Sequence, residues 1–136
     1  MKANATTNKV NEIVTRGYIT EKEINLLKNR VNNDRASISE LDDLGGMRIT
    51  IEQTAKGLTW LIDKWKTQRG TERKNNPFGY REQDILENFD HFELAGFYNA
   101  SDSYNRAFYV PLYDVCAKDG RHFEYYVWGG EVQIVG

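Results

Sequence analysis

The sequence contains little cysteine and no long apolar run. Its single cysteine, Cys116, excludes an intramolecular disulfide, and the paired CxxC motifs of structural zinc sites are absent. No stretch approaches the roughly 18 apolar residues of a membrane-spanning helix, and the N-terminus lacks the apolar segment of a signal peptide. These absences predict a cytoplasmic protein with no membrane partner.

Motifs of enzymes are also absent. The sequence has no GxSxG, HExxH or GxGxxG pattern, and it predicts no cofactor. Glu93 and Glu124 fall within expected strands, where two carboxylates could approach each other as an acid and base pair. Because strand glutamates usually serve solubility, we expect no catalytic residues. A hydrolase or small-ligand receptor that uses these sheet carboxylates stays an alternative.

What is present predicts a single α+β domain over residues 1–136, with N-terminal helices packed on a C-terminal sheet of three or four antiparallel strands. Residues 1–7 are expected to form a flexible tail. Val10 and Ile13 have helical spacing, and Gly17 is a suitable stop for this helix. Thr20 and Glu23 form the capping-box pattern of a second helix, which extends to about Asn33.

The middle of the chain predicts one long helix and a loop. Residues 51–65 carry apolar side chains at spacings of four and three, which indicates the principal helix. A basic connector loop at 69–80 follows. The pattern then predicts a short helix at 80–88 with Ile85, Leu86 and Phe89 inward. A strand from Phe92 to Tyr98 follows, in which Gly96 marks a bulge or a close backbone approach.

The C-terminal third predicts a β-hairpin around Asp119 and Gly120, since this dipeptide favours a two-residue type I′ turn. Counting outward from such a turn pairs Cys116 with Phe123, Asp114 with Tyr125 and Leu112 with Val127 on a core face. The opposite face then carries Tyr113 with Tyr126, and Pro111 with Trp128. A last strand is expected at 131–135, after Gly129 and Gly130.

This register argues against a metal site. It directs Cys116 to the core and His122 to the other face, so the two side chains cannot hold one ion. Cys116 is then best interpreted as a small buried residue.

The side chains opposite the core suggest a function. Aromatic residues dominate protein interfaces, and acidic neighbours attract a basic partner. We therefore expect a non-catalytic binding or adaptor module that recognises a protein and that inhibits or supports nucleic-acid machinery. Its partner-binding residues would be Tyr109, Tyr113, Tyr126, Trp128 and Glu124. Whether helices cover these rings stays open at this point.

The charge distribution favours a second hypothesis. Residues 64–81 contain six basic side chains against one acidic one, together with aromatic residues. Such a mixture can bind phosphates by charge and stack bases on rings. Direct nucleic-acid binding through this segment is the alternative, with polyanion contacts from Lys64, Lys66, Arg69, Arg73, Lys74 and Arg81.

Overall fold

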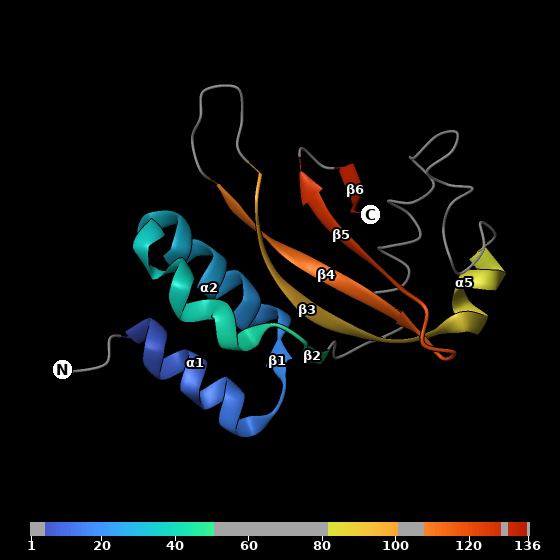
Figure 1. The fold of residues 1–136 in the computed structure, drawn as a ribbon, viewed down its shortest axis with the longest axis horizontal. Coiled ribbons are helices and arrows are strands. Elements are labelled where there is room, and N and C mark those ends of the chain that lie inside the picture. The colour runs from blue at the N-terminus through green and yellow to red at the C-terminus, as the bar shows by residue number, and fades with distance from the viewer. Residues whose placement is uncertain (1–4, 51–81, 101–107, 129–130, 136) are drawn as a thin grey trace.

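A computed structural model describes residues 5–50, 82–100, 108–128 and 131–135 of the chain. Helices come first in the chain, and most of the sheet comes last (Figure 1). The predicted α+β class, with N-terminal helices and a C-terminal antiparallel sheet, is confirmed. The predicted principal helix at 51–65 and the basic connector at 69–80 lie outside the described residues.

Helix α1 (Ala5–Arg16) ends where the sequence predicts. Gly17 follows it with a φ of 92°, in the left-handed region that glycine adopts at little cost. Val10 and Ile13 are buried. The helix begins earlier than expected, because Thr6 is also buried. Residues 5–7 of the expected tail form the first turn of α1.

Helix α2 (Glu21–Asn33) begins at the predicted capping box. The Glu23 amide donates a hydrogen bond to Thr20 Oγ1 at 3.2 Å, and the Thr20 amide donates to Glu23 Oε1 at 3.1 Å. Glu23 is buried and also forms ion pairs with Lys9 and Arg16 of α1. One carboxylate thus caps α2 and ties it to α1.

The chain then runs through short elements into the sheet. A 3₁₀ segment, η1 (Arg35–Leu44), is followed by strand β2 (Met47–Thr50), which pairs in parallel with the two-residue strand β1 (Ile19–Thr20). Helix α5 (Glu82–Asn88) leads directly into the long strand β3 (Phe89–Asn99). Leu86 of α5 is exposed, so its predicted inward position is wrong.

The described strands lie in the order β1-β2-β3-β4-β5-β6, and all neighbours from β2 onward are antiparallel. Strands β4 (Tyr109–Ala117), β5 (His122–Trp128) and β6 (Glu131–Val135) are those expected at the C-terminus. Six strands in the described part of the chain exceed the predicted three or four. The difference arises because β2 pairs with the edge of the C-terminal strands, and β1 pairs with β2.

The turn between β4 and β5 is one residue longer than predicted. The Ala117 amide donates to the Arg121 carbonyl at 2.7 Å, and the Gly120 amide donates to the Ala117 carbonyl at 3.1 Å. Lys118, Asp119 and Gly120 therefore form a three-residue loop. Gly120 has a φ of 90° and supplies the left-handed residue that such a loop requires.

The longer turn overturns the predicted register of β4. The observed partners are Cys116 with His122, Val115 with Phe123, Asp114 with Glu124, and Tyr113 with Tyr125. Successive side chains of a strand point to opposite faces, so a shift of one residue exchanges the two faces of β4 relative to β5. The predicted pairing of Cys116 with Phe123 is wrong for this reason.

One face of the sheet, termed the inner face, packs against the helices (Figure 1). Their shared core contains Val10, Ile13, Ile24, Leu27, Val31, Leu44, Phe92, Leu94, Val115, Phe123 and Tyr125. Asn32 adds a polar link between α2 and β4. Its Oδ1 accepts from the Tyr109 amide at 2.7 Å, and its Nδ2 donates to the Tyr109 carbonyl at 2.9 Å.

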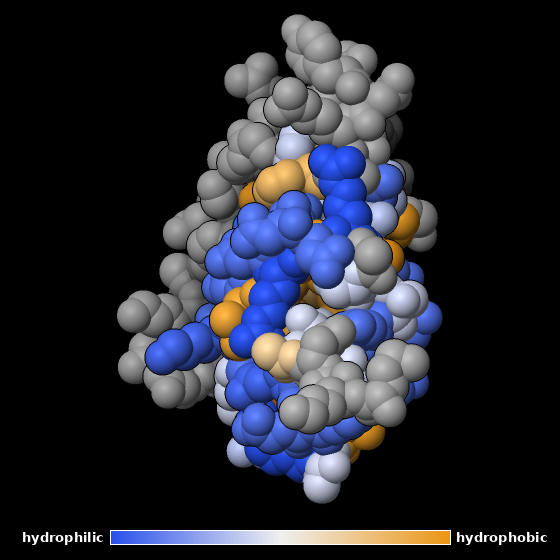
Figure 2. Space-filling view, turned by 90° about the vertical axis from the view of Figure 1, so that its left-hand side faces the viewer, coloured by the Kyte–Doolittle hydropathy of each residue, from blue (hydrophilic) through white to orange (hydrophobic). Residues whose placement is uncertain are grey.

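The surface on the helical side is mainly hydrophilic, with hydrophobic residues in small separate groups (Figure 2). This fits amphipathic helices whose apolar residues pack against the inner face of the sheet. Among the described residues, none of the helices combines the length and apolar character that crossing a bilayer would take.

Candidate functional site

The face of the sheet away from the helices, termed the outer face, is shaped by two bulges in β3. Pairing with β4 shifts by one residue between Phe89 and His91, and again between Leu94 and Gly96. The first shift inserts Asp90, so His91 lies on the outer face although Phe89 belongs to the core. The second shift leaves Ala95, directly before Gly96, without a partner in the pairing with β4, so of the bulge or close approach expected at Gly96 the structure shows a bulge.

Four aromatic rings gather at one end of the outer face, termed the aromatic end: Tyr98, Phe108, Tyr126 and Trp128. The rings of Tyr98 and Tyr126 stack with centroids 4.3 Å apart, and those of Phe108 and Trp128 are 5.3 Å apart. Tyr98, Phe108 and Trp128 are 38%, 37% and 40% exposed. Grouped, partly exposed rings are typical of contact surfaces.

Two of the five predicted partner-binding residues lie on the inner face instead. Tyr113 stacks on buried Tyr125 with centroids 5.2 Å apart, and burial raises the pKa of Tyr113 to about 12. Tyr109 also packs against the core. Their predicted face was wrong because the register of β4 was wrong by one residue. Tyr126, Trp128 and Glu124 lie on the outer face, as predicted.

The other end of the outer face, beside the β4–β5 turn, is termed the polar end and holds six titratable side chains in two rows. Directly paired residues of β3, β4 and β5 form the first row, His91, Cys116 and His122. The second row, two residues further along each strand, is Glu93, Asp114 and Glu124. The first row thus contains both histidines and the single cysteine of the chain.

Short contacts join the two rows. Cys116 Sγ donates to Glu93 Oε2 at 3.2 Å, and His91 Nε2 lies 3.7 Å from the same oxygen. His122 Nδ1 lies 2.9 Å from Asp114 Oδ1. The ligand atoms of His91, Glu93 and Cys116 all lie within 4.8 Å of one another. Imidazole, carboxylate and thiolate are the ligand types of zinc, so these three residues could hold a metal ion.

The carboxylates also control the protonation of Cys116. Burial, the hydrogen bond to Glu93 and the charge of Asp114 together raise the pKa of the Cys116 thiol to about 12. Burial raises the pKa of Asp114 as well, although its contact with His122 opposes this. Because the thiolate is the reactive form of cysteine, Cys116 in this environment is a poor nucleophile. The arrangement does not favour covalent catalysis.

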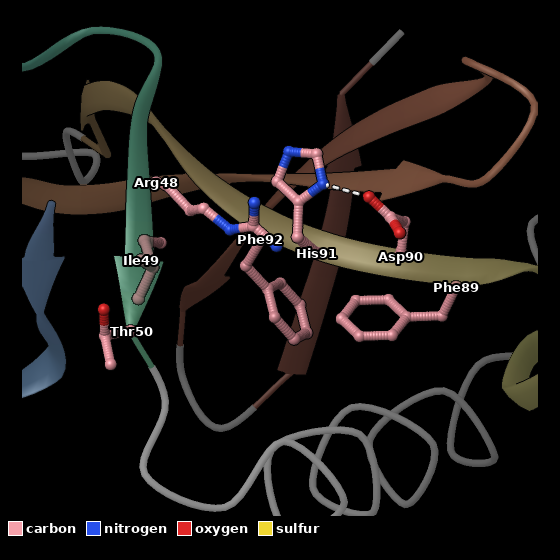
Figure 3. A pocket seen from close by; sticks show the side chains of 7 residues that line it. All are labelled: Arg48, Ile49, Thr50, Phe89, Asp90, His91 and Phe92. Atoms are coloured by element: carbon pink, nitrogen blue, oxygen red, sulfur yellow. Dashed lines mark hydrogen bonds and ion pairs between the residues drawn. The ribbon is translucent and has the colours of Figure 1, made fainter. Parts of the chain in front are cut away.

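A pocket of about 200 Å³ lies beside the polar end, between β2 and the start of β3. Arg48, Thr50, Asp90 and His91 supply its polar groups, and Ile49, Phe89 and Phe92 its apolar ones. Figure 3 shows His91 and Phe92 projecting to opposite sides of β3, with the Asp90 carboxylate 2.7 Å from His91 Nδ1. The bulge at Asp90 places this carboxylate against the histidine ring.

The sequence did not predict that the side chains of the polar end lie together on one face. The prediction that Cys116 and His122 lie on opposite faces, which excluded a shared metal site, is wrong, since the two residues are direct partners. The position of Asp114 was a sequence signal for the longer turn. The two-residue turn directed this carboxylate to the core face, where an unpaired charge is costly, whereas a three-residue loop directs it beside Glu124.

The six predicted polyanion-binding residues all fall within 51–81, outside the described residues. Their role in nucleic-acid binding stays a prediction. Comparison of the chain with family models, with curated proteins and with solved structures gave no match. The outer face is therefore the candidate functional surface.

Proposed function

We propose that this protein is a non-catalytic binding module that contacts a basic segment of a protein partner through the aromatic end. The observation that supports it most is the cluster of rings itself. Tyr98, Phe108 and Trp128 each keep more than a third of their surface exposed, although they contact neighbouring rings. Rigid aromatic side chains lose little conformational entropy on binding, which makes them effective contact residues.

The charge of the outer face supports a basic partner. Glu93, Asp114 and Glu124 form a row of carboxylates across the same face. From Glu82 to the C-terminus, the sequence has ten acidic residues against three basic ones. Such a surface attracts cationic segments and repels a phosphate backbone. Charge therefore favours a protein over a nucleic acid as the occupant of this face.

The test is quantitative affinity capture from a nuclease-treated cell lysate. The immobilised wild type is compared with the double variant Tyr98→Ala/Trp128→Ala and with the control Leu86→Ala, which truncates an exposed apolar residue on α5. We expect proteins rich in basic segments to be retained by the wild type and the control. Hot-spot truncation should reduce their recovery by roughly 10-fold or more.

A second variant tests the charge. Glu124→Lys should weaken capture of the same proteins and make the remaining binding less sensitive to salt. Recovery that is equal for the wild type and the double variant would refute the proposal. Capture that is lost on nuclease treatment would also refute it and would favour binding through residues 64–81.

A further inference from the structure

We infer that His91, Glu93 and Cys116 form a zinc-binding site at the polar end of the outer face. This inference goes beyond the proposed function, because it concerns the opposite end of that face and a different ligand. The three residues come from two strands, and the pairing of His91 with Cys116 brings them together. Both histidines and the single cysteine of the chain fall in one row across the sheet.

The distances fit a single ion after small side-chain rotations. Ligands of tetrahedral zinc, with metal bonds of about 2.0 to 2.3 Å, lie about 3.3 to 3.7 Å from one another. Glu93 Oε2 lies 3.2 Å from Cys116 Sγ and 3.7 Å from His91 Nε2. All three ligand atoms lie within 4.8 Å of one another. The mixture of sulfur, nitrogen and oxygen favours zinc over magnesium or calcium, which prefer oxygen alone.

The second coordination shell is also in place. Zinc-binding histidines usually present their other ring nitrogen to a carboxylate or carbonyl, which fixes the ring and its tautomer. His91 Nδ1 lies 2.7 Å from Asp90 Oδ2, so Nε2 is the nitrogen left to face Glu93. The β-bulge that contains Asp90 creates this arrangement, since without it His91 would point to the inner face.

The charges around the site favour a cation. Glu93, Asp114 and Glu124 are direct neighbours across three strands, and like charges in this position destabilise a sheet. Arg48 of β2 is the strand partner of Glu93, so its positive charge lies on the same face of the sheet. Among the described residues, Arg121 in the turn before β5 forms an ion pair with Asp119. A divalent ion would offset the remaining repulsion.

Binding of zinc exchanges the thiol proton of Cys116 for the metal ion. The bond from zinc to sulfur forms as the S–H bond of Cys116 breaks, and the proton leaves for solvent. Glu93 already accepts that S–H hydrogen bond, so the proton has a route outward. Zinc stabilises the thiolate that the surrounding carboxylates otherwise disfavour. With three protein ligands, the fourth position would be taken by water, because His122 is engaged by Asp114.

The test uses the chelator-treated full-length chain and Co²⁺ as a spectroscopic probe for Zn²⁺. We expect one equivalent of Co²⁺ to give a sulfur-to-cobalt charge-transfer band, which Zn²⁺ displaces and Cys116→Ser abolishes. His91→Gln and Glu93→Gln should weaken binding by more than about 10-fold. The matched control is His122→Gln, which removes the other histidine of the row and should leave affinity within about 2-fold.

A measurement on the wild type avoids any doubt about variant folding. Zn²⁺ should slow alkylation of Cys116, the only thiol of the chain, and a chelator should restore the rate. Absence of both the cobalt band and the protection would overturn the inference. A loss in His122→Gln as large as that in His91→Gln would also overturn the assignment of these three ligands, because His122 would then contribute to the site as much as His91.

Discussion

The inner and outer faces of the sheet are built from adjacent residues but differ in what they contribute. On the inner face, Leu94 and Val115 are fully buried against the helices. On the outer face, the neighbouring Glu93 and Cys116 are partly exposed, and they contact each other. Core residues and residues of the proposed binding face thus alternate along each strand. This alternation predicts that substitutions on the two faces have different consequences.

The largest effect is expected from a cavity on the inner face. Leu94→Ala removes a fully buried side chain and should lower the free energy of unfolding by about 3 kcal/mol. The matched control is Leu112→Ala on the outer face, where the side chain is half-buried and the loss should be about 1 kcal/mol. Urea denaturation measures both. Equal losses would contradict the separation of the faces.

A smaller effect is expected where the helices join. Burial by itself would raise the pKa of Glu23, but hydrogen bonds from Arg16, Lys9 and Thr20 outweigh it and lower this pKa to about 2. Glu23→Gln keeps a capping oxygen and loses the charge, so it should cost about 2 kcal/mol at neutral pH.

The pH dependence follows from the sign of this shift. A carboxyl whose folded pKa is depressed stabilises the fold above its ordinary pKa of 4.5, and this contribution is lost as the pH falls toward about 2. The wild type and Glu23→Gln should therefore converge in stability over that interval. Unfolding curves recorded across it provide the check, and a constant difference would show that the charge is not responsible.

The smallest effect on stability is expected at the aromatic end. Trp128→Ala should lower the free energy of unfolding by only about 1 kcal/mol, because its side chain is 40% exposed and its ring packs on the partly exposed ring of Phe108. The same substitution should have a large effect on partner capture. Thermal unfolding measures the first quantity, and a loss comparable to that of Leu94→Ala would place Trp128 in the core.

The sequence predicted the elements whose signals are local. Gly17 ends α1, and the Thr20–Glu23 capping box begins α2, because both signals act within a few residues of the backbone that they satisfy. Gly96 was interpreted from the same kind of local signal as a bulge or a close approach, and the structure shows a bulge beside it. The pairing of β1 and β2 with the rest of the sheet was not, since no local pattern specifies which distant strands become neighbours.

The polar end was missed because it depends on the number of residues in the turn between β4 and β5. Asp119 and Gly120 are compatible with a two-residue turn, and they are equally compatible with the observed three-residue loop. The choice decides whether Cys116 faces the core or faces His122. The aromatic end was predicted in part. The side chains of β5 were assigned to the correct faces, because this assignment does not depend on the register of β4. Phe108 and Tyr98 were omitted because neither belongs to the predicted hairpin pairs.

The register of β4 against β5 is the central claim, and disulfide trapping tests it most directly. Because Ala117 and Arg121 form a hydrogen-bonded pair, Cys116 and His122 form a close non-hydrogen-bonded pair, about 4.5 Å between Cα atoms, within reach of a disulfide. Under mild oxidation with a chelator present, His122→Cys should form an intramolecular disulfide with Cys116, and Phe123→Cys should remain reduced. A disulfide in Phe123→Cys but not in His122→Cys would contradict the register and both faces described from it.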